Sequence, residues 1–120
     1  MEIVEPTPDD VYMLSYTSGT TGNPKGVKLT QRMVLNASQG VNDRVSEGAL
    51  GGLSPADSYL SYLPMAHSFE QSFFGTCLIY GMRCGFYSGN LLQITSDLEK
   101  LKPTIFCSVP SFFNRIYGKI

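Results

Sequence analysis

The stretch from Tyr16 to Val27, YTSGTTGNPKGV, gathers residue types that bind anions. Its members are four hydroxyl residues, three glycines and one lysine: Thr17, Ser18, Thr20, Thr21, Gly19, Gly22, Gly26 and Lys25. Glycines let the backbone turn tightly and bring N–H groups close to an anion, and hydroxyls add short hydrogen bonds. The lysine adds a positive charge on a flexible stem. Together these residues predict a loop that binds a polyphosphate.

The spacing within this loop differs from two common nucleotide-binding motifs. Pro24 precedes Lys25 and Gly26 follows it, which is the wrong order for a Walker A loop. Gly19 and Gly22 are not followed by a third glycine at the dinucleotide-binding offset. A plain hairpin loop is the simpler alternative, because threonine, serine, glycine and Asn-Pro all favour turns.

His67, the only histidine, lies in the second stretch that could carry chemistry, YLPMAHSFE. A single histidine after a strand is more often a structural residue bonded to a backbone group than a catalyst. Glu70 is either its partner or a solvated helix residue. By composition, Phe69, Phe73 and Phe74 suit an ordinary hydrophobic core.

Strands and helices alternate along the chain, which predicts an α/β fold with a largely parallel sheet. Apolar runs bounded by turn residues predict strands over 10–18, 26–30, 59–64, 84–89 and 104–110, the first of them buried. Helical periodicity predicts helices over 31–48, 68–81, 91–103 and 110–120. The first helix has Thr30 as its N-cap and an apolar stripe of Met33, Ala37, Val41 and Val45.

Composition excludes several classes of partner. The chain has 120 residues and a net charge of -1, and no basic cluster interleaves with aromatic residues, so nucleic acid is not expected as a partner. The longest nearly apolar run, Phe73–Met82, is about half of the ~20 residues that a membrane-spanning helix needs. Three cysteines lie inside apolar stretches without CxxC spacing, which predicts buried thiols in a reducing compartment and not a disulfide framework or a zinc site. We therefore expect an intracellular protein, cytoplasmic or attached to a membrane periphery through other parts.

The segment YTSGTTGNPKGV resembles, along its whole length, the phosphate-binding signature of the adenylate-forming (AMP-binding) superfamily. That superfamily comprises acyl-CoA synthetases, firefly luciferase and the adenylation domains of peptide synthetases. YLPMAHSFE resembles the next core motif in the form seen in long-chain fatty acyl-CoA synthetases, and CGFYSGN and LKPTIFCSVPSFFNRIY are similar to the stretch that follows. The resemblance implies that residues 9–120 form part of the large N-terminal domain of such an enzyme, after a leader over 1–8.

The resemblance also implies a reaction. A fatty acid carboxylate attacks the α-phosphate of ATP to give an acyl-adenylate, and the thiol of coenzyme A then displaces AMP. Thr17, Ser18, Thr20, Thr21 and Lys25 would hold the β- and γ-phosphates, with backbone access at Gly19 and Gly22 and with Thr17 helping to place Mg²⁺. His67, Phe69 and Phe73 would position the acyl substrate.

Several of the superfamily's motifs are not in these residues: the adenine-binding Gly-Tyr-Gly-x-Thr-Glu, the ribose-binding aspartate, the hinge and the C-terminal lysine. We therefore expect a fragment of a long-chain fatty acid–CoA ligase that contains no complete catalytic set and is inactive alone. Two alternatives stay open. One is a fragment of another adenylating enzyme, such as a short-chain synthetase or a peptide-synthetase domain, and the other is a non-catalytic phosphate-binding module.

Overall fold

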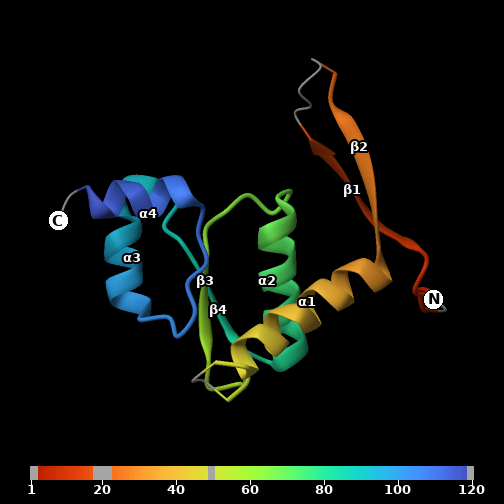
Figure 1. The fold of residues 1–120 in the computed structure, drawn as a ribbon, viewed down its shortest axis with the longest axis horizontal. Coiled ribbons are helices and arrows are strands. Elements are labelled where there is room, and N and C mark those ends of the chain that lie inside the picture. Colours follow the sequence, from red (N-terminus) through yellow and green to blue (C-terminus); the bar gives the residue numbers. More distant parts are fainter. Residues whose placement is uncertain (1–2, 18–22, 49–50, 119–120) are drawn as a thin grey trace.

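The computed structural model describes residues 3–17, 23–48 and 51–118. An antiparallel hairpin begins the chain and an α/β body follows it (Figure 1). The elements in order are β1 (Val11–Thr17), β2 (Lys25–Thr30), α1 (Gln31–Ser46), β3 (Ser58–Ser61), α2 (Ser68–Tyr80), β4 (Arg83–Phe86), a 3-10 turn (Leu91–Gln93), α3 (Ile94–Leu101) and α4 (Pro110–Tyr117).

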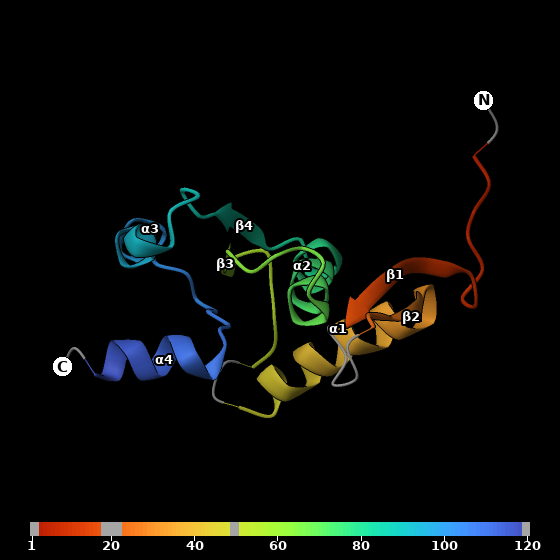
Figure 2. The same ribbon diagram turned by 90° about the horizontal axis from the view of Figure 1, so that it is seen from above.

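Helices cover both faces of the parallel pair β3–β4 (Figure 2). Helix α2 lies on one side of this pair, with α1 beyond it, and α3 and α4 lie on the other side (Figure 2). All four residues of β3 are buried, as expected for a parallel strand covered on both faces. The predicted α/β class with parallel strand pairing is confirmed.

Side chains alternate across β3 and so divide the core into two parts. Tyr59 and Ser61 point toward α2, where both contact Glu70. Leu60 points the other way, into a cluster with Ile94 of α3 and Phe112 of α4. This period of two follows from strand geometry and gives each side of the sheet its own set of contacts.

The prediction of a strand over 104–110 is wrong. This segment makes a single parallel bridge, between Ile105 and Tyr59, and the Ile105 N–H donates to the Ser58 carbonyl at 3.0 Å. The next residue, Phe106, stacks on Tyr62 at 5.6 Å and packs against Phe112 at 5.4 Å. Packing into the core on the α4 side draws the segment away from the strand edge after one bridge.

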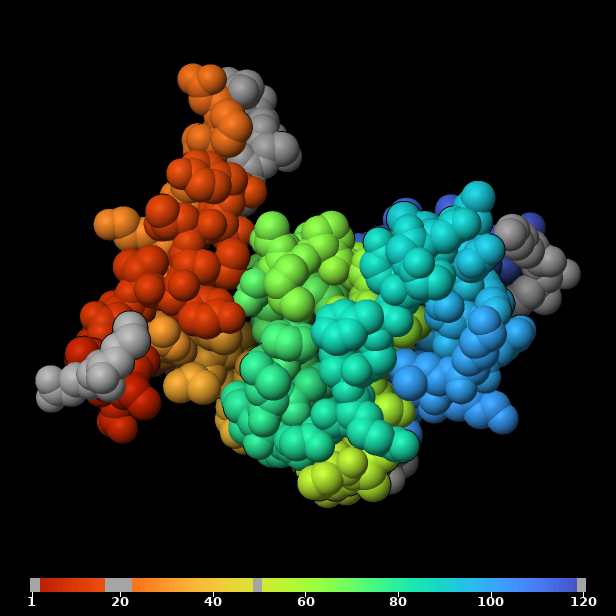
Figure 3. All heavy atoms as spheres, turned by 180° about the vertical axis from the view of Figure 1, so that it is seen from behind, coloured from red at the N-terminus to blue at the C-terminus, as the bar shows by residue number. Residues whose placement is uncertain are grey.

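The hairpin β1–β2 is confirmed, but the prediction that its first strand is buried is wrong. The register pairs Thr17 with Lys25 at the loop end, and Leu14 and Tyr16 are 52% and 69% exposed. The far half of the hairpin extends beyond the body (Figure 3). Among the described residues no layer covers it, so the two strands have mainly each other as neighbours.

Helix α1 begins at its predicted N-cap, since the Thr30 hydroxyl accepts from the Met33 N–H at 3.4 Å. Its predicted apolar stripe is only half right. Val41 and Val45 are half-buried, whereas Met33 and Ala37 are exposed. The predicted stripe counts apolar residues only, but the residue that α1 buries completely is the polar Ser38. Its hydroxyl donates to the Ser72 carbonyl of α2 at 3.2 Å.

Close packing of α1 against α2 depends on Gly75. A methyl group added there would lie 2.8 Å from the Ser38 Oγ, which is buried and bonded to the helix opposite. Gly40 on α1 has no atom within 4 Å of such a methyl group. The two helical glycines therefore differ in what a larger residue would meet.

We expect Gly40→Ala and Gly75→Ala to change stability in opposite directions. Alanine in a helix interior gains ~0.5–1 kcal/mol over glycine, so Gly40→Ala should raise the free energy of unfolding by that amount. At Gly75 the same gain is outweighed by overpacking, which costs ~1–3 kcal/mol, for a net loss. Denaturant titration of both variants measures the difference, and equal rises would contradict the packing described for Ser38.

All three cysteines are free thiols. Cys77 is buried, as predicted, whereas Cys84 and Cys107 are only half-buried. Burial is the main cause that raises the pKa of the Cys77 and Cys107 thiols to about 12. Within the described ranges, no helix combines the length and apolar character needed to cross a bilayer.

Candidate active site

The hairpin presents the predicted phosphate loop between two strand ends. β1 ends at Thr17 and β2 begins at Lys25, and these residues are partners across the ladder. Five predicted binding residues, Ser18, Gly19, Thr20, Thr21 and Gly22, lie outside the described residues. The described part therefore fixes the base of the loop, with an exposed Lys25 at its far side.

The structure also explains why a glycine occupies position 26 of this motif. It pairs with Tyr16 across the hairpin, and an added methyl group would approach the Tyr16 ring to 3.3 Å. The ring thus covers the backbone next to Lys25. A cross-strand aromatic residue opposite glycine supports the strand where glycine itself has no side chain to pack.

His67 caps α2. Its Nδ1 accepts from the Phe69 N–H at 3.2 Å, and the backbone N–H of His67 donates to the Pro64 carbonyl at 2.8 Å. An accepting Nδ1 places the ring proton on Nε2. None of the described residues accepts from Nε2, and the residue is exposed, so this edge of the ring can donate to a ligand. The structure thus shows the backbone contacts of the structural interpretation, and the substrate-positioning role of His67 stays a prediction.

The hairpin meets the turn that carries His67. The Ser15 hydroxyl of β1 donates to the Ala66 carbonyl at 3.4 Å, although the two residues are far apart in sequence. Close to this junction, β2, α1 and α2 enclose a small cavity of about 100 Å³, lined by Leu29, Met33, Val34, Ala37, Ser68, Gln71 and Ser72. The strand that leads into the predicted phosphate loop thus contacts the turn before the predicted acyl-positioning helix.

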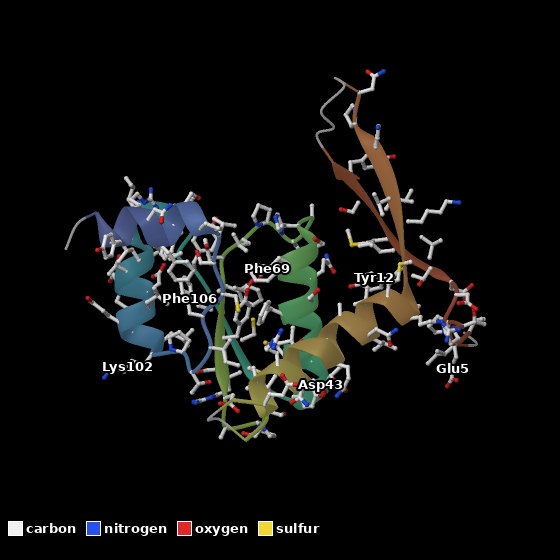
Figure 4. All side chains as sticks on the ribbon, viewed as in Figure 1. Glu5, Tyr12, Asp43, Phe69, Lys102 and Phe106 are labelled. Carbon is white, nitrogen blue, oxygen red and sulfur yellow. The ribbon has the colours of Figure 1, made fainter. Side chains whose placement is uncertain are left out.

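Aromatic rings follow α2 inward from His67. Phe69 is 38% exposed and lies on the side of α2 that faces β3 (Figure 4). Its ring meets Phe73 edge-on at 5.0 Å, and Phe73 stacks on the buried Tyr59 at 5.6 Å. Phe74 turns toward β4, where it packs against Phe86 at 6.4 Å. Phe69 and Phe73 are thus brought together near His67, and Phe74 is not.

Both sequence interpretations of Glu70 are wrong. It is neither a partner of His67 nor solvated, because it is fully buried. Tyr59 donates to its Oε2 at 2.7 Å and Ser61 donates to its Oε1 at 2.5 Å. Burial, followed by the bond to Glu70, raises the Tyr59 pKa. The available signal was the i, i+2 spacing of two hydroxyl residues on one face of β3.

No group of three or more His, Cys, Asp or Glu that could hold a metal ion occurs in 3–17, 23–48 and 51–118. The placement of Mg²⁺ by Thr17 therefore rests on the sequence resemblance, and on the place of Thr17 at the base of the loop.

Known proteins are similar to this sequence along nearly its whole length. Long-chain-fatty-acid–CoA ligase 6 from Rattus norvegicus is 42% identical over 98% of this chain and 16% of that protein. Long chain acyl-CoA synthetase 6, peroxisomal, from Arabidopsis thaliana is also 42% identical, over 96% of this chain and 16% of that protein. The chain thus spans about 16% of the length of these curated relatives.

Solved structures share the fold. The inhibitor-bound N-terminal domain of FACL13 from Mycobacterium tuberculosis superposes with a TM-score of 0.76 at 26% identity, over 94% of this chain and 27% of that one. The family model for AMP-binding enzymes matches residues 1–119. From the match to this model over almost every residue, we conclude that the chain belongs to the AMP-binding enzyme family.

Proposed function

We propose that this chain is part of the large N-terminal domain of a long-chain fatty acid–CoA ligase, with residues 9–120 as the domain segment. The ligase activates a fatty acid with ATP to an acyl-adenylate and transfers the acyl group to coenzyme A. The observation that carries the proposal is the junction where the hairpin bearing YTSGTTGNPKGV meets the turn of YLPMAHSFE, through Ser15 and Ala66. Relatives named as long-chain synthetases, at about 40% identity, support the choice of substrate.

Phosphate binding falls to the hairpin loop. Negative charge builds on the phosphates as the carboxylate attacks, and donors already in place around them stabilise what develops. Lys25 brings a cation to one end of the loop. Hydroxyls of Thr17, Ser18, Thr20 and Thr21 donate to the β- and γ-phosphates, with backbone N–H groups at Gly19 and Gly22. Mg²⁺, held with the help of Thr17, supplies further charge neutralisation when bound.

The acyl substrate falls to the beginning of α2. His67 donates from Nε2 and so orients a polar group of the substrate, without acting as a general base, because the attacking carboxylate is already ionised. Phe69 and Phe73 provide an apolar wall that continues inward from His67. The exposed ring of Phe69 and the half-buried ring of Phe73 thus suit contact with an alkyl chain.

Three free thiols suit a reducing compartment, and we infer an intracellular ligase on that ground.

The activity is tested on the full-length protein that contains this chain. With ATP, Mg²⁺, palmitate and coenzyme A, we expect release of pyrophosphate and AMP and formation of palmitoyl-CoA. Parallel reactions with acetate and with amino acids test the other adenylating classes. The 120 residues alone are expected to release no pyrophosphate above a loop-variant control, since the relatives are about six times longer. Preference for acetate or an amino acid over palmitate would refute the long-chain assignment.

A further inference from the structure

Glu70 is a buried acid whose polar atoms are all directed at one strand. Its exposed fraction is 0%, and its two oxygens accept from two side chains of β3, Tyr59 and Ser61. Neither ion pair of the described residues includes it, since these join Arg32 to Asp9 and Arg44 to Glu47. The carboxylate is thus held by hydroxyl donors, not by a cation.

Such a group is a costly way to fill space. Burying a carboxylate without a cation is unfavourable, and an apolar residue of similar volume would pack here at lower cost. The place of Glu70 in the first turn of α2 recovers part of that cost, because the positive end of the helix dipole favours an acid there. Leucine could not make the two short hydrogen bonds to Tyr59 and Ser61, and these bonds fix where this turn lies on β3.

The turn fixed in this way carries the proposed substrate contacts. Glu70 is three residues after His67. The residue directly before Glu70, Phe69, contacts Phe73, which stacks on Tyr59. Tyr59 therefore does two things: it donates to Glu70 and supports the Phe73 ring. A second tie holds the turn before α2, because the Gln71 amide donates to the Met65 carbonyl at 2.5 Å.

We propose that Glu70 is a positioning residue whose bonds to Tyr59 and Ser61 fix the first turn of α2 on β3, and thereby set where His67 and Phe69 meet the acyl substrate. The inference rests on the proposed function for its kinetic consequence. Its structural part, the fixed turn, can be measured without any activity.

The test compares Glu70→Leu, Glu70→Gln and Thr76→Val in the full-length protein. Leucine removes both bonds and keeps similar volume. Glutamine keeps one acceptor, and its amide can donate to the second hydroxyl, because a hydroxyl also accepts. Thr76 is the matched control: it is 1% exposed on the same helix, but its hydroxyl contacts Ser72 and the Ser38 carbonyl of α1, away from β3.

We expect Glu70→Leu to raise the KM for palmitate about ten- to a hundredfold while the KM for ATP stays nearly constant, since small displacements of positioning groups have effects of this size. Glu70→Gln should restore most of the loss. Thr76→Val should lower the melting temperature without changing either KM. An equal rise in the KM values for palmitate and ATP, or a Glu70→Gln variant as impaired as Glu70→Leu, would overturn the proposal.

Amide hydrogen exchange over residues 65–73 provides the readout that does not depend on turnover. The Phe69 N–H, bonded to His67, should exchange faster in Glu70→Leu than in Thr76→Val, and near the wild-type rate in Glu70→Gln. Unchanged exchange in Glu70→Leu would overturn the fixed turn. If the wild type adenylates no fatty acid, the proposed function fails, and the exchange result still decides whether Glu70 fixes this turn.

Discussion

Lys25→Ala in the full-length protein is expected to slow acyl-adenylate formation, or to weaken ATP binding, by about ten- to a hundredfold. Hydrogen bonds to charged groups contribute ~1.5–3 kcal/mol, and a factor of ten in rate corresponds to ~1.4 kcal/mol. Lys25 begins β2 opposite Thr17, at the base of the proposed phosphate loop. The effect should therefore fall on the step that uses the phosphates and leave the preference among fatty acids unchanged.

Lys28→Ala is the matched control for this experiment. Lys28 lies on the same strand and is exposed like Lys25, but it pairs with Leu14, away from the loop. Pyrophosphate release at varied ATP concentration, and then with acids of different length, separates the two substrates. The phosphate assignment would be wrong if Lys25→Ala changed fatty-acid selectivity and left the ATP dependence as it was, or if both lysine variants lost activity equally.

Local signals in the sequence predicted the elements that have local causes. The N-cap at Thr30, the hairpin around the glycine-rich loop and the proline at the start of α4 are each set by neighbouring residues, and the structure has all three. The strand predicted over 104–110 depended instead on a nonlocal choice. Phe106 could continue a strand or enter the aromatic core, and its contacts with Tyr62 and Phe112 decided for the core.

Burial was harder to predict than secondary structure, because it depends on which elements pack together. β1 reads as an apolar strand, yet only β2 pairs with it in the described residues, and Leu14 stays exposed. The polar side chains Ser38 and Glu70 are fully buried because each finds partners on a neighbouring element. A pattern that counts only apolar residues cannot find such pairs, and it missed Glu70 for this reason.

The prediction of the site rests on sequence motifs and not on packing. The sequence placed His67 before a helix and a strand before the glycine-rich stretch, and the structure has His67 as the N-cap of α2 and a strand that ends at Thr17. The contact between Ser15 and Ala66 could not be foreseen, because it depends on how the hairpin is oriented relative to the helices that follow it. The roles of His67 and of the loop residues stay predictions to be tested by kinetics.

Enlarging an aromatic residue of α2 is expected to have the second large effect on activity, because a ring in the core and a ring that lines a substrate site respond differently to enlargement. Phe73 lies in line with the exposed Phe69 and stacks on Tyr59, whereas the adjacent Phe74 turns to Phe86 on β4. Both are half-buried, so Phe73→Trp and Phe74→Trp add the same volume at similar exposure. The pair therefore isolates the direction in which each ring points.

We expect Phe73→Trp to lose at least tenfold more activity on palmitate than on a short fatty acid, while its melting temperature stays near that of the wild type. The added ring would fill space proposed for the alkyl chain, and a tenfold loss corresponds to ~1.4 kcal/mol. Phe74→Trp should keep the wild-type order of acids. Enlarging a ring in packed core instead costs ~1–3 kcal/mol of stability, whatever the substrate. If Phe73→Trp melts early and loses short and long acids together, Phe73 supports Tyr59 as core, and the acyl chain runs along another face of α2.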